Sequence, residues 1–239
     1  MVIKTIGARN DEFLYQFSSN TLKNSATDAT INLHMTPYKL PLCAAQTEFE
    51  EKHSRFIAQI TPASSEEEAL TFLRDVRKKH REATHNVYAY RIANEGTPIC
   101  RHSDDGEPSG TAGMPLLEVF LKQDIYDFCC VATRYFGGTK LGAGGLVRAY
   151  ARCGSVALEA SGIGLMREMI LCTAVLPYPL YEPVRHLLDS HDANISGEDF
   201  GTEVMLTFSI ATEQLPAIKD TITELTAGAV SIQADYSGK

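Results

Sequence analysis

The chain has 239 residues, of which 44% are hydrophobic and 22% charged, and its mean hydropathy is −0.13. Such a composition is typical of a globular protein with a sizeable core, and no apolar stretch approaches the roughly 20 residues of a membrane-spanning helix, so no membrane partner is expected. The net charge of −8, from 22 basic and 30 acidic residues, argues against a general nucleic-acid-binding protein.

The charge is unevenly distributed along the chain. Residues 163–239 carry four basic and eleven acidic residues, whereas residues 35–162 carry 15 and 16. The excess acid therefore lies in the last third, and the middle of the chain can still present a basic surface.

The cysteines and the first residues predict a cytoplasmic location. The chain has no Cys-x-x-Cys spacing, and Asp11 and Glu12 interrupt any apolar core of a signal peptide. We interpret the cysteines as mostly buried thiols of a reducing compartment.

Residues 1–34 differ from the rest of the chain. The stretch 18–28 is rich in Ser, Thr and Asn and has no sustained periodicity. We interpret residues 1–34 as a flexible extension or as the result of a start assigned upstream of Met35, with a docked arm as the alternative.

The middle of the chain, residues 35–162, predicts one α+β domain. Ser65 and Glu68 form a capping box that opens a helix ending near His80. The continuous apolar run of 126–136 is typical of a central strand. The further predicted elements are strands over 54–60 and 87–92, a polar turn over 101–113, a short helix over 116–121, and a helix over 144–160.

A second domain is expected over residues 163–239, after Gly162 and Gly164. Its predicted order is strand 169–176, helix 180–190, strands 194–199 and 203–210, helix 214–226 and strand 229–234. This β-α-β-β-α-β order in about 70 residues is the split β-α-β, or ferredoxin-like, arrangement.

An acidic loop is the first candidate site. It contains Ser103, Asp104, Asp105, Gly106, Glu107, Pro108, Gly110 and Thr111. The three carboxylates are weak candidates for a Mg²⁺ site, and the alternative is a rigid turn whose side chains cap backbone groups.

A glycine-rich loop before a helix is the second candidate site. Its glycines are Gly137, Gly138, Gly142, Gly144 and Gly145. Backbone N–H groups at a helix N-terminus favour an anion, although such glycines also serve close packing, and neither a Walker nor a Rossmann spacing is present.

Basic residues surround this second loop. Residues 128–158 contain no acid and four cations, which are Arg134, Lys140, Arg148 and Arg152. The aromatic residues among them, Tyr135, Phe136 and Tyr150, suit base stacking but are equally typical of a core. No cysteine, histidine or triad pattern predicts a catalytic residue, and no cofactor is expected.

Four stretches together resemble the YigZ/IMPACT family. They are 54–58, with Ser54, Arg55 and Phe56; 84–90, with His85; the acidic loop 103–115; and the glycine-rich stretch 134–150. The resemblance covers the chain from about Pro37 onward. It implies that residues 35–162 form an IMPACT N-terminal domain like domain 2 of ribosomal protein S5, and that residues 163–239 resemble the last domain of elongation factor G.

The resemblance also implies a role linked to translation, because eukaryotic relatives regulate translation. We expect a non-enzymatic regulator that contacts RNA or the ribosome through residues 35–162. The acidic last third would bind a protein partner or a second copy. The alternative is an enzyme of small-molecule phosphates or nucleotides that uses both loops, although this rests on fold analogy.

Overall fold

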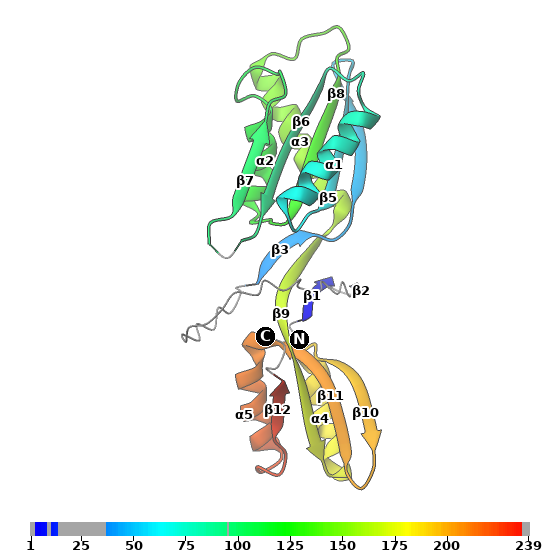
Figure 1. Ribbon diagram of the computed structural model, residues 1–239, viewed down its shortest axis with the longest axis vertical. Coiled ribbons are helices and arrows are strands. Elements are labelled where there is room, and N and C mark those ends of the chain that lie inside the picture. Colours follow the sequence, from blue (N-terminus) through cyan, green and yellow to red (C-terminus); the bar gives the residue numbers. More distant parts are fainter. Residues whose placement is uncertain (1–2, 9–10, 14–36, 95, 236–239) are drawn as a thin grey trace. The chain divides into compact units, whose positions relative to one another are not determined.

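The computed structural model describes residues 3–8, 11–13, 37–94 and 96–235, with only the backbone described for the first two ranges (Figure 1). The prediction for residues 1–34 falls largely outside these ranges and stays a prediction. The elements are β1 (Ile3–Ala8), β2 (Asp11–Phe13), β3 (Tyr38–Pro41), β4 (Ala45–Glu51), β5 (Ser54–Pro62), α1 (Glu66–Lys79), β6 (His85–Ile92), β7 (Ile99–Ser103), α2 (Gly113–Lys122), β8 (Phe128–Tyr135), α3 (Ala143–Ser161), β9 (Ile163–Leu176), α4 (Tyr178–Ser190), β10 (Asn194–Phe200), β11 (Val204–Ala211), α5 (Leu215–Leu225) and β12 (Ile232–Asp235).

The chain divides into two compact units, each with helices and a sheet, as the α+β prediction requires. The first unit comprises Tyr38–Leu165, and the second comprises the residues from Met166 onward together with β2 and most of β1. The division falls inside β9, a few residues after Gly162, which ends α3 with a left-handed φ of 69°.

The first unit is built on a five-stranded antiparallel sheet in the order β4-β5-β8-β6-β7. β8 is the middle strand, as its continuous apolar sequence predicts. Successive side chains of a strand point to opposite faces. Phe128, Cys130 and Ala132 accordingly pack with α2 and α3, whereas Cys129 and Val131 pack with α1.

The first helix, α1, starts and ends where its caps predict. Ser65 accepts a hydrogen bond from the Glu68 N–H at 3.2 Å, and His80 is the C-cap. The reciprocal half of the capping box differs from the expectation, because the Glu68 carboxylate accepts from the N–H and hydroxyl of Ser64 rather than from the N–H of Ser65.

The second unit follows the predicted order of strands and helices. β9, α4, β10, β11, α5 and β12 follow one another, and the sheet has the neighbours β10-β11-β9-β12. On β11, Val204, Leu206, Phe208 and Ile210 are buried with the helices, as the alternating pattern predicts. Met205 lies between them and is exposed.

The sequence did not predict β3, β4 or β7. β4 reads AQTEFEE, and its mostly acidic and polar side chains suit an edge strand with little burial. β7 contains the polar residues Arg101, His102 and Ser103, which the sequence analysis assigned to a turn, and it too lies at the sheet edge. Across the ranges that the structure describes, no helix is long and apolar enough to cross a membrane.

Candidate functional site

Arg134 occupies a position that differs from the expected phosphate contact. It continues the row of Phe128, Cys130 and Ala132 on the face of β8 that α2 and α3 cover, and its residue is only 4% exposed. Its neighbours across the sheet are Phe56 on β5 and His85 on β6. We therefore do not retain Arg134 as a direct contact to nucleic acid.

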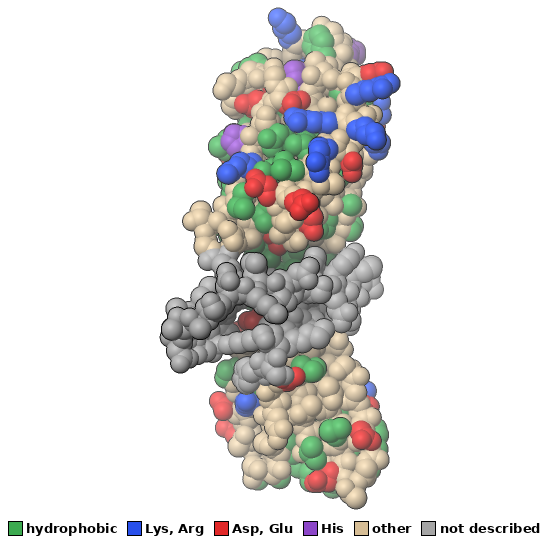
Figure 2. Space-filling view, in the orientation of Figure 1, with side chains coloured by type: hydrophobic (Ala, Val, Ile, Leu, Met, Phe, Trp, Pro, Cys, Tyr) green, Lys and Arg blue, Asp and Glu red, His purple; other side chains and the backbone are tan. Residues whose placement is uncertain are grey.

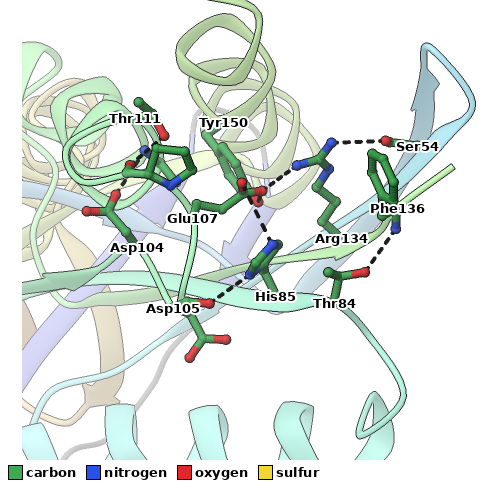
Figure 3. Close-up of polar contacts among 12 residues, drawn as sticks. Ser54, Thr84, His85, Asp104, Asp105, Glu107, Thr111, Arg134, Phe136 and Tyr150 are labelled. Carbon is green, nitrogen blue, oxygen red and sulfur yellow. Dashed lines mark hydrogen bonds and ion pairs between the residues drawn. The ribbon is translucent and has the colours of Figure 1, made fainter. Parts of the chain in front are cut away.

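A buried carboxylate neutralises this arginine (Figure 3). The Arg134 guanidinium donates to the Oε1 atom of Glu107 at 2.6 Å, and both side chains are about 95% buried, at 5% and 4% exposure. The Tyr150 hydroxyl donates to the same oxygen at 2.7 Å. Burial, followed by the nearby Glu107 charge, raises the pKa of Tyr150 well above its ordinary value, so the phenol stays a donor.

His85 and Ser54 complete this network. His85 Nε2 lies 3.8 Å from the second Glu107 oxygen, and its Nδ1 donates to the Asp105 carbonyl at 2.8 Å. Because a carbonyl only accepts, Nδ1 carries a proton. The Ser54 hydroxyl accepts from Arg134 at 3.1 Å. We call Ser54, His85, Glu107, Arg134 and Tyr150 the buried polar network.

The network joins all four sequence stretches that carry the family resemblance. Ser54 starts β5, His85 starts β6, Glu107 lies in the acidic loop, and Arg134 and Tyr150 lie on β8 and α3. Phe56 packs beside it with its ring edge-on to Tyr150 at 5.5 Å. Five polar groups that are distant in sequence are therefore brought together inside the first unit, although the buried Nε atom of Arg134 has no hydrogen-bond partner.

The acidic loop is held by its own carboxylates. Asp104 accepts from the N–H groups of Gly110, Ala112 and Gly113 at 2.8, 3.0 and 2.8 Å, and the last two lie at the start of α2. Burial acts to raise the pKa of Asp104, but these hydrogen bonds outweigh it and lower the pKa. Asp104 thus caps a helix that has no capping side chain of its own.

The other residues of the loop also have defined partners. Asp105 accepts from the Asn86 N–H at 2.6 Å and from the Arg77 guanidinium at 2.7 Å. Ser103 accepts from the Asp105 N–H, the Pro108 carbonyl accepts from Thr111, and Gly106 has a φ of 88° beside His85. Within the described ranges no group of three His, Cys, Asp or Glu residues could hold a metal ion. The three carboxylates here serve as anchors for the loop.

In the glycine-rich loop, one glycine is required by close packing, whereas others have open space around them. A Cβ at Gly137 would lie 1.8 Å from the His53 carbonyl oxygen, so this glycine lets β8 end against the β4–β5 turn. Gly138 and Gly142 have left-handed φ values of 85° and 76° with open space around them. Gly144 and Gly145 lie in the first turn of α3, which has no acidic residue and no capping side chain.

Three of the four predicted cations remain at the surface near this loop. Lys140, Arg148 and Arg152 are exposed. The Arg148 guanidinium folds back toward Gly144, lying 3.6 Å from the position of a Cβ there. Arg152 lies 4.2 Å above the ring of Phe49 on β4.

The three aromatic residues among these cations differ in how deeply they are buried. Tyr150 is buried, and Tyr135 is partly buried with its hydroxyl 3.0 Å from His80. Phe136 is 46% exposed, and its N–H donates to the Thr84 hydroxyl at 3.0 Å. Only Phe136 of this set is thus exposed beside the glycine-rich loop, and the Arg134 guanidinium carbon lies 5.5 Å from the centre of its ring.

We define the loop surface as Phe136, Lys140, Arg148 and Arg152 together with the first turn of α3. The buried polar network lies directly behind it, because Ser54 accepts from both Arg134 and the Gly137 N–H, the latter at 3.4 Å. On the face that Figure 2 displays, the basic side chains of the first unit gather mainly over α1, which packs on the opposite side of the sheet from α3.

The sequence also left two positions of the motif unexplained. Arg55 faces solvent and binds the Glu48 carboxylate with two bonds of 2.6 and 2.8 Å. Thr84 was not predicted as a site residue, and it ties the start of β6 to the end of β8 through Phe136 and Arg134. Thr84 immediately precedes the observed strand, but the predicted strand began only at residue 87, so the sequence carried no clear signal for it.

Comparisons with known proteins place both units. The Impact N-terminal domain matches residues 52–158, and a domain of unknown function, DUF1949, matches residues 175–229. The IMPACT family member YvyE of Bacillus subtilis is 36% identical over 80% of this chain and 87% of its own length. The chain belongs to the IMPACT family.

Other members of the IMPACT family agree with this assignment. YigZ of Escherichia coli is 28% identical over 84% of this chain and 98% of its own length. A crystal structure described as a hypothetical protein, also 28% identical, covers 84% of this chain and 98% of that one with a TM-score of 0.54. A structure described as the two-domain translational regulator Yih1 is 23% identical with a TM-score of 0.31, a likeness too distant to carry an argument.

Proposed function

We propose that this IMPACT family member is a non-enzymatic regulator linked to translation, and that its loop surface contacts RNA or the ribosome. The observation that carries the proposal is that one acid-free segment holds both the exposed ring of Phe136 and three exposed cations. Aromatic rings stack on bases, and cations bind phosphates. The translation link rests on the family, and the exposure of these side chains supports the loop surface as the place of contact.

The arrangement at α3 supports binding of phosphate. Free N–H groups at the first turn of a helix and the helix dipole both favour an anion. No acidic side chain of the first turn of α3 competes for these groups, and Lys140 and Arg148 add formal positive charge beside them. We therefore propose that this surface binds mainly the phosphates of the RNA backbone, with a base stacked on Phe136.

The alternative, a nucleotide or phosphate enzyme, has weaker support. It needs the acidic loop to present Mg²⁺ ligands, but Asp104, Asp105 and Glu107 already accept hydrogen bonds from three different parts of the first unit. No observation therefore favours the enzyme over the binding protein.

We further propose a partner for the second unit, a fold type for each unit and a location. The second unit, with its excess of acid, repels phosphate and serves a protein partner or a second copy. The observed strand and helix orders are the support for an S5 domain 2-like first unit and a ferredoxin-like second unit. A role at the ribosome also implies a cytoplasmic location.

The test is cosedimentation of the full chain with ribosomes at low and high salt, with a labelled single-stranded RNA measured by fluorescence anisotropy. The double variant Lys140→Glu/Arg148→Glu should abolish salt-sensitive comigration. For single strands each lost phosphate contact should reduce the slope of log K against log salt by about 0.7. The matched control Lys122→Glu/Lys219→Glu changes the charge equally and should behave as wild type.

Two outcomes would refute the proposal. One is binding by the Lys140→Glu/Arg148→Glu variant with unchanged affinity and salt slope. The other is absence of the wild-type chain from every ribosomal fraction together with no affinity for the RNA.

A further inference from the structure

The second unit carries an aromatic cluster at the surface, where the tip of the β10–β11 hairpin meets the start of α4. Tyr178 and Phe200 are 51% and 52% exposed, and their ring centroids are 6.4 Å apart. The Tyr181 ring stands edge-on to Phe200 at 5.4 Å. We call these three residues the aromatic cluster. Exposed aromatic groups of this kind are enriched where proteins bind partners.

The cluster is held in place before any partner arrives. The Tyr178 hydroxyl donates to the Gly201 carbonyl at 2.8 Å, and that of Tyr181 donates to Glu198 at 3.0 Å. These bonds fix the start of α4 to the hairpin. A binding partner would therefore not have to order these side chains, which lowers the entropic cost of association.

The cluster already accommodates one guanidinium. Arg185 donates to the Tyr181 hydroxyl at 2.8 Å and lies 5.8 Å from the centre of that ring, with Glu198 at 3.9 Å. Tyr181 and Glu198 thus already bind a cation of the same unit, Arg185. Tyr178 and Phe200 keep open ring faces, and such faces attract Arg and Lys side chains.

The surrounding charge is negative. From Met166 to Asp235 the chain has three basic and eleven acidic residues. Glu182 is exposed and follows Tyr178 by four residues on α4, so both lie on one helix face. Glu203 is exposed in the turn that joins Phe200 to Val204, the last residue pair of the hairpin. Figure 2 shows acidic and hydrophobic side chains together on the visible face of this unit.

We propose that the aromatic cluster binds a basic segment of a partner protein, with an Arg or Lys side chain seated over Tyr178 and Phe200 and held by Glu182 and Glu203. The proposal rests on the protein-binding role proposed above for the second unit, and it names the place and the chemistry. A nucleic acid is disfavoured there because the acids would repel its phosphates.

The probe is a fluorescein-labelled peptide of alternating Arg and Leu, with a Glu and Leu peptide of equal length for comparison. Anisotropy measures binding to the full chain. The variant Phe200→Ser/Glu182→Gln should weaken binding of the basic peptide about 5- to 30-fold. The matched variant Leu225→Ser/Glu224→Gln alters an equally exposed pair on α5 and should leave the affinity unchanged.

A second variant separates binding from folding. Phe200→Leu keeps an apolar contact with Tyr181 but removes the aromatic face, so it should weaken binding while amide chemical shifts of β11 stay unchanged. If the β11 amide chemical shifts change in Phe200→Ser, that variant has lost local structure. The affinity of Phe200→Leu for the basic peptide then tests the proposal.

Several results would overturn the proposal, and they are distinguishable. Equal affinity of both paired variants for the basic peptide would refute the cluster as the site but leave the second unit a protein binder. No binding of the basic peptide to the wild-type chain would refute both. A concentration-dependent dimer that Phe200→Ser/Glu182→Gln abolishes would replace the partner by a second copy. RNA binding through Lys140 and Arg148 is measured separately and tests only the first unit.

Discussion

Removing the buried arginine should strongly destabilise the first unit. In the variant Arg134→Met the Glu107 carboxylate loses a 2.6 Å ion pair while remaining 4% exposed. Tyr150 and His85 still face it, but the guanidinium that formed the 2.6 Å ion pair is gone. Breaking one partner of a buried pair typically costs about 3–5 kcal/mol of unfolding free energy, because a charge is left uncompensated.

The chain contains a matched control for this experiment. Arg55 and Glu48 form an ion pair of the same 2.6 Å length on the neighbouring strands β4 and β5, but their side chains are 54% and 46% exposed. Arg55→Met should therefore change stability far less than Arg134→Met, since water solvates the remaining carboxylate. The same substitution at the same distance thus isolates the effect of burial.

The measurement is urea unfolding of the full chain, with hydrogen exchange of β8 peptides by mass spectrometry to assign the transition to the first unit. The double variant Arg134→Met/Glu107→Gln should recover much of the loss, because no buried charge then remains. Equal losses for Arg134→Met and Arg55→Met would refute the reasoning. So would a double variant no more stable than Arg134→Met.

Three smaller predictions concern the two loops and the thiols. Gly137→Ala should cost about 1–3 kcal/mol in urea unfolding, because its Cβ meets the β4–β5 turn, whereas Gly144→Ala in the open first turn of α3 should stabilise by about 0.5–1 kcal/mol; equal effects would contradict this. Asp104→Ala should cost about 0.5–2 kcal/mol through loss of the α2 cap. Because the folded pKa of Asp104 is lowered, its contribution is present above the ordinary pKa and lost as pH falls through the folded value, so the wild-type and variant stabilities should converge in acid. In thiol titration of the native chain Cys43, which is exposed, should react first, and burial, which raises the pKa of Cys129 to about 12, should protect the buried thiols; equal rates would refute this.

The sequence predicted those parts of the fold whose signals are local. α1 has its caps and its charge order, β8 its continuous apolar run, and β11 its alternation, and each appears within a residue or two of the expected bounds. β4 and β7 lack such signals because they are edge strands with polar sequences. Their pairing depends on the neighbouring strand, which a local pattern does not contain.

Arg134 illustrates which features of the site could be predicted from the sequence and which could not. The two-residue period of β8 already places it on the face of Phe128, Cys130 and Ala132, and a cation in a central strand requires a buried partner. The partner itself, Glu107, lies 27 residues away in a loop whose conformation depends on α2. The direction of the side chain was therefore predictable, and its ion pair was not.

Neighbouring residues of the glycine-rich stretch 134–150 have different surroundings, and we therefore expect them to have different roles. Arg134 lies on β8 and Phe136 follows the end of that strand, and the Arg134 guanidinium carbon is 5.5 Å from the centre of the Phe136 ring. Arg134 nevertheless pairs with Glu107 in the interior, whereas Phe136 is 46% exposed. A change at Arg134 should therefore lower stability, and it should disturb RNA binding only indirectly, through the Phe136 ring beside it and through the loop that Ser54 holds. Phe136→Leu should weaken RNA binding by roughly 1–3 kcal/mol per stacked base without altering unfolding. If both changes shifted stability and binding in parallel, the loop surface would have no binding role apart from the buried polar network.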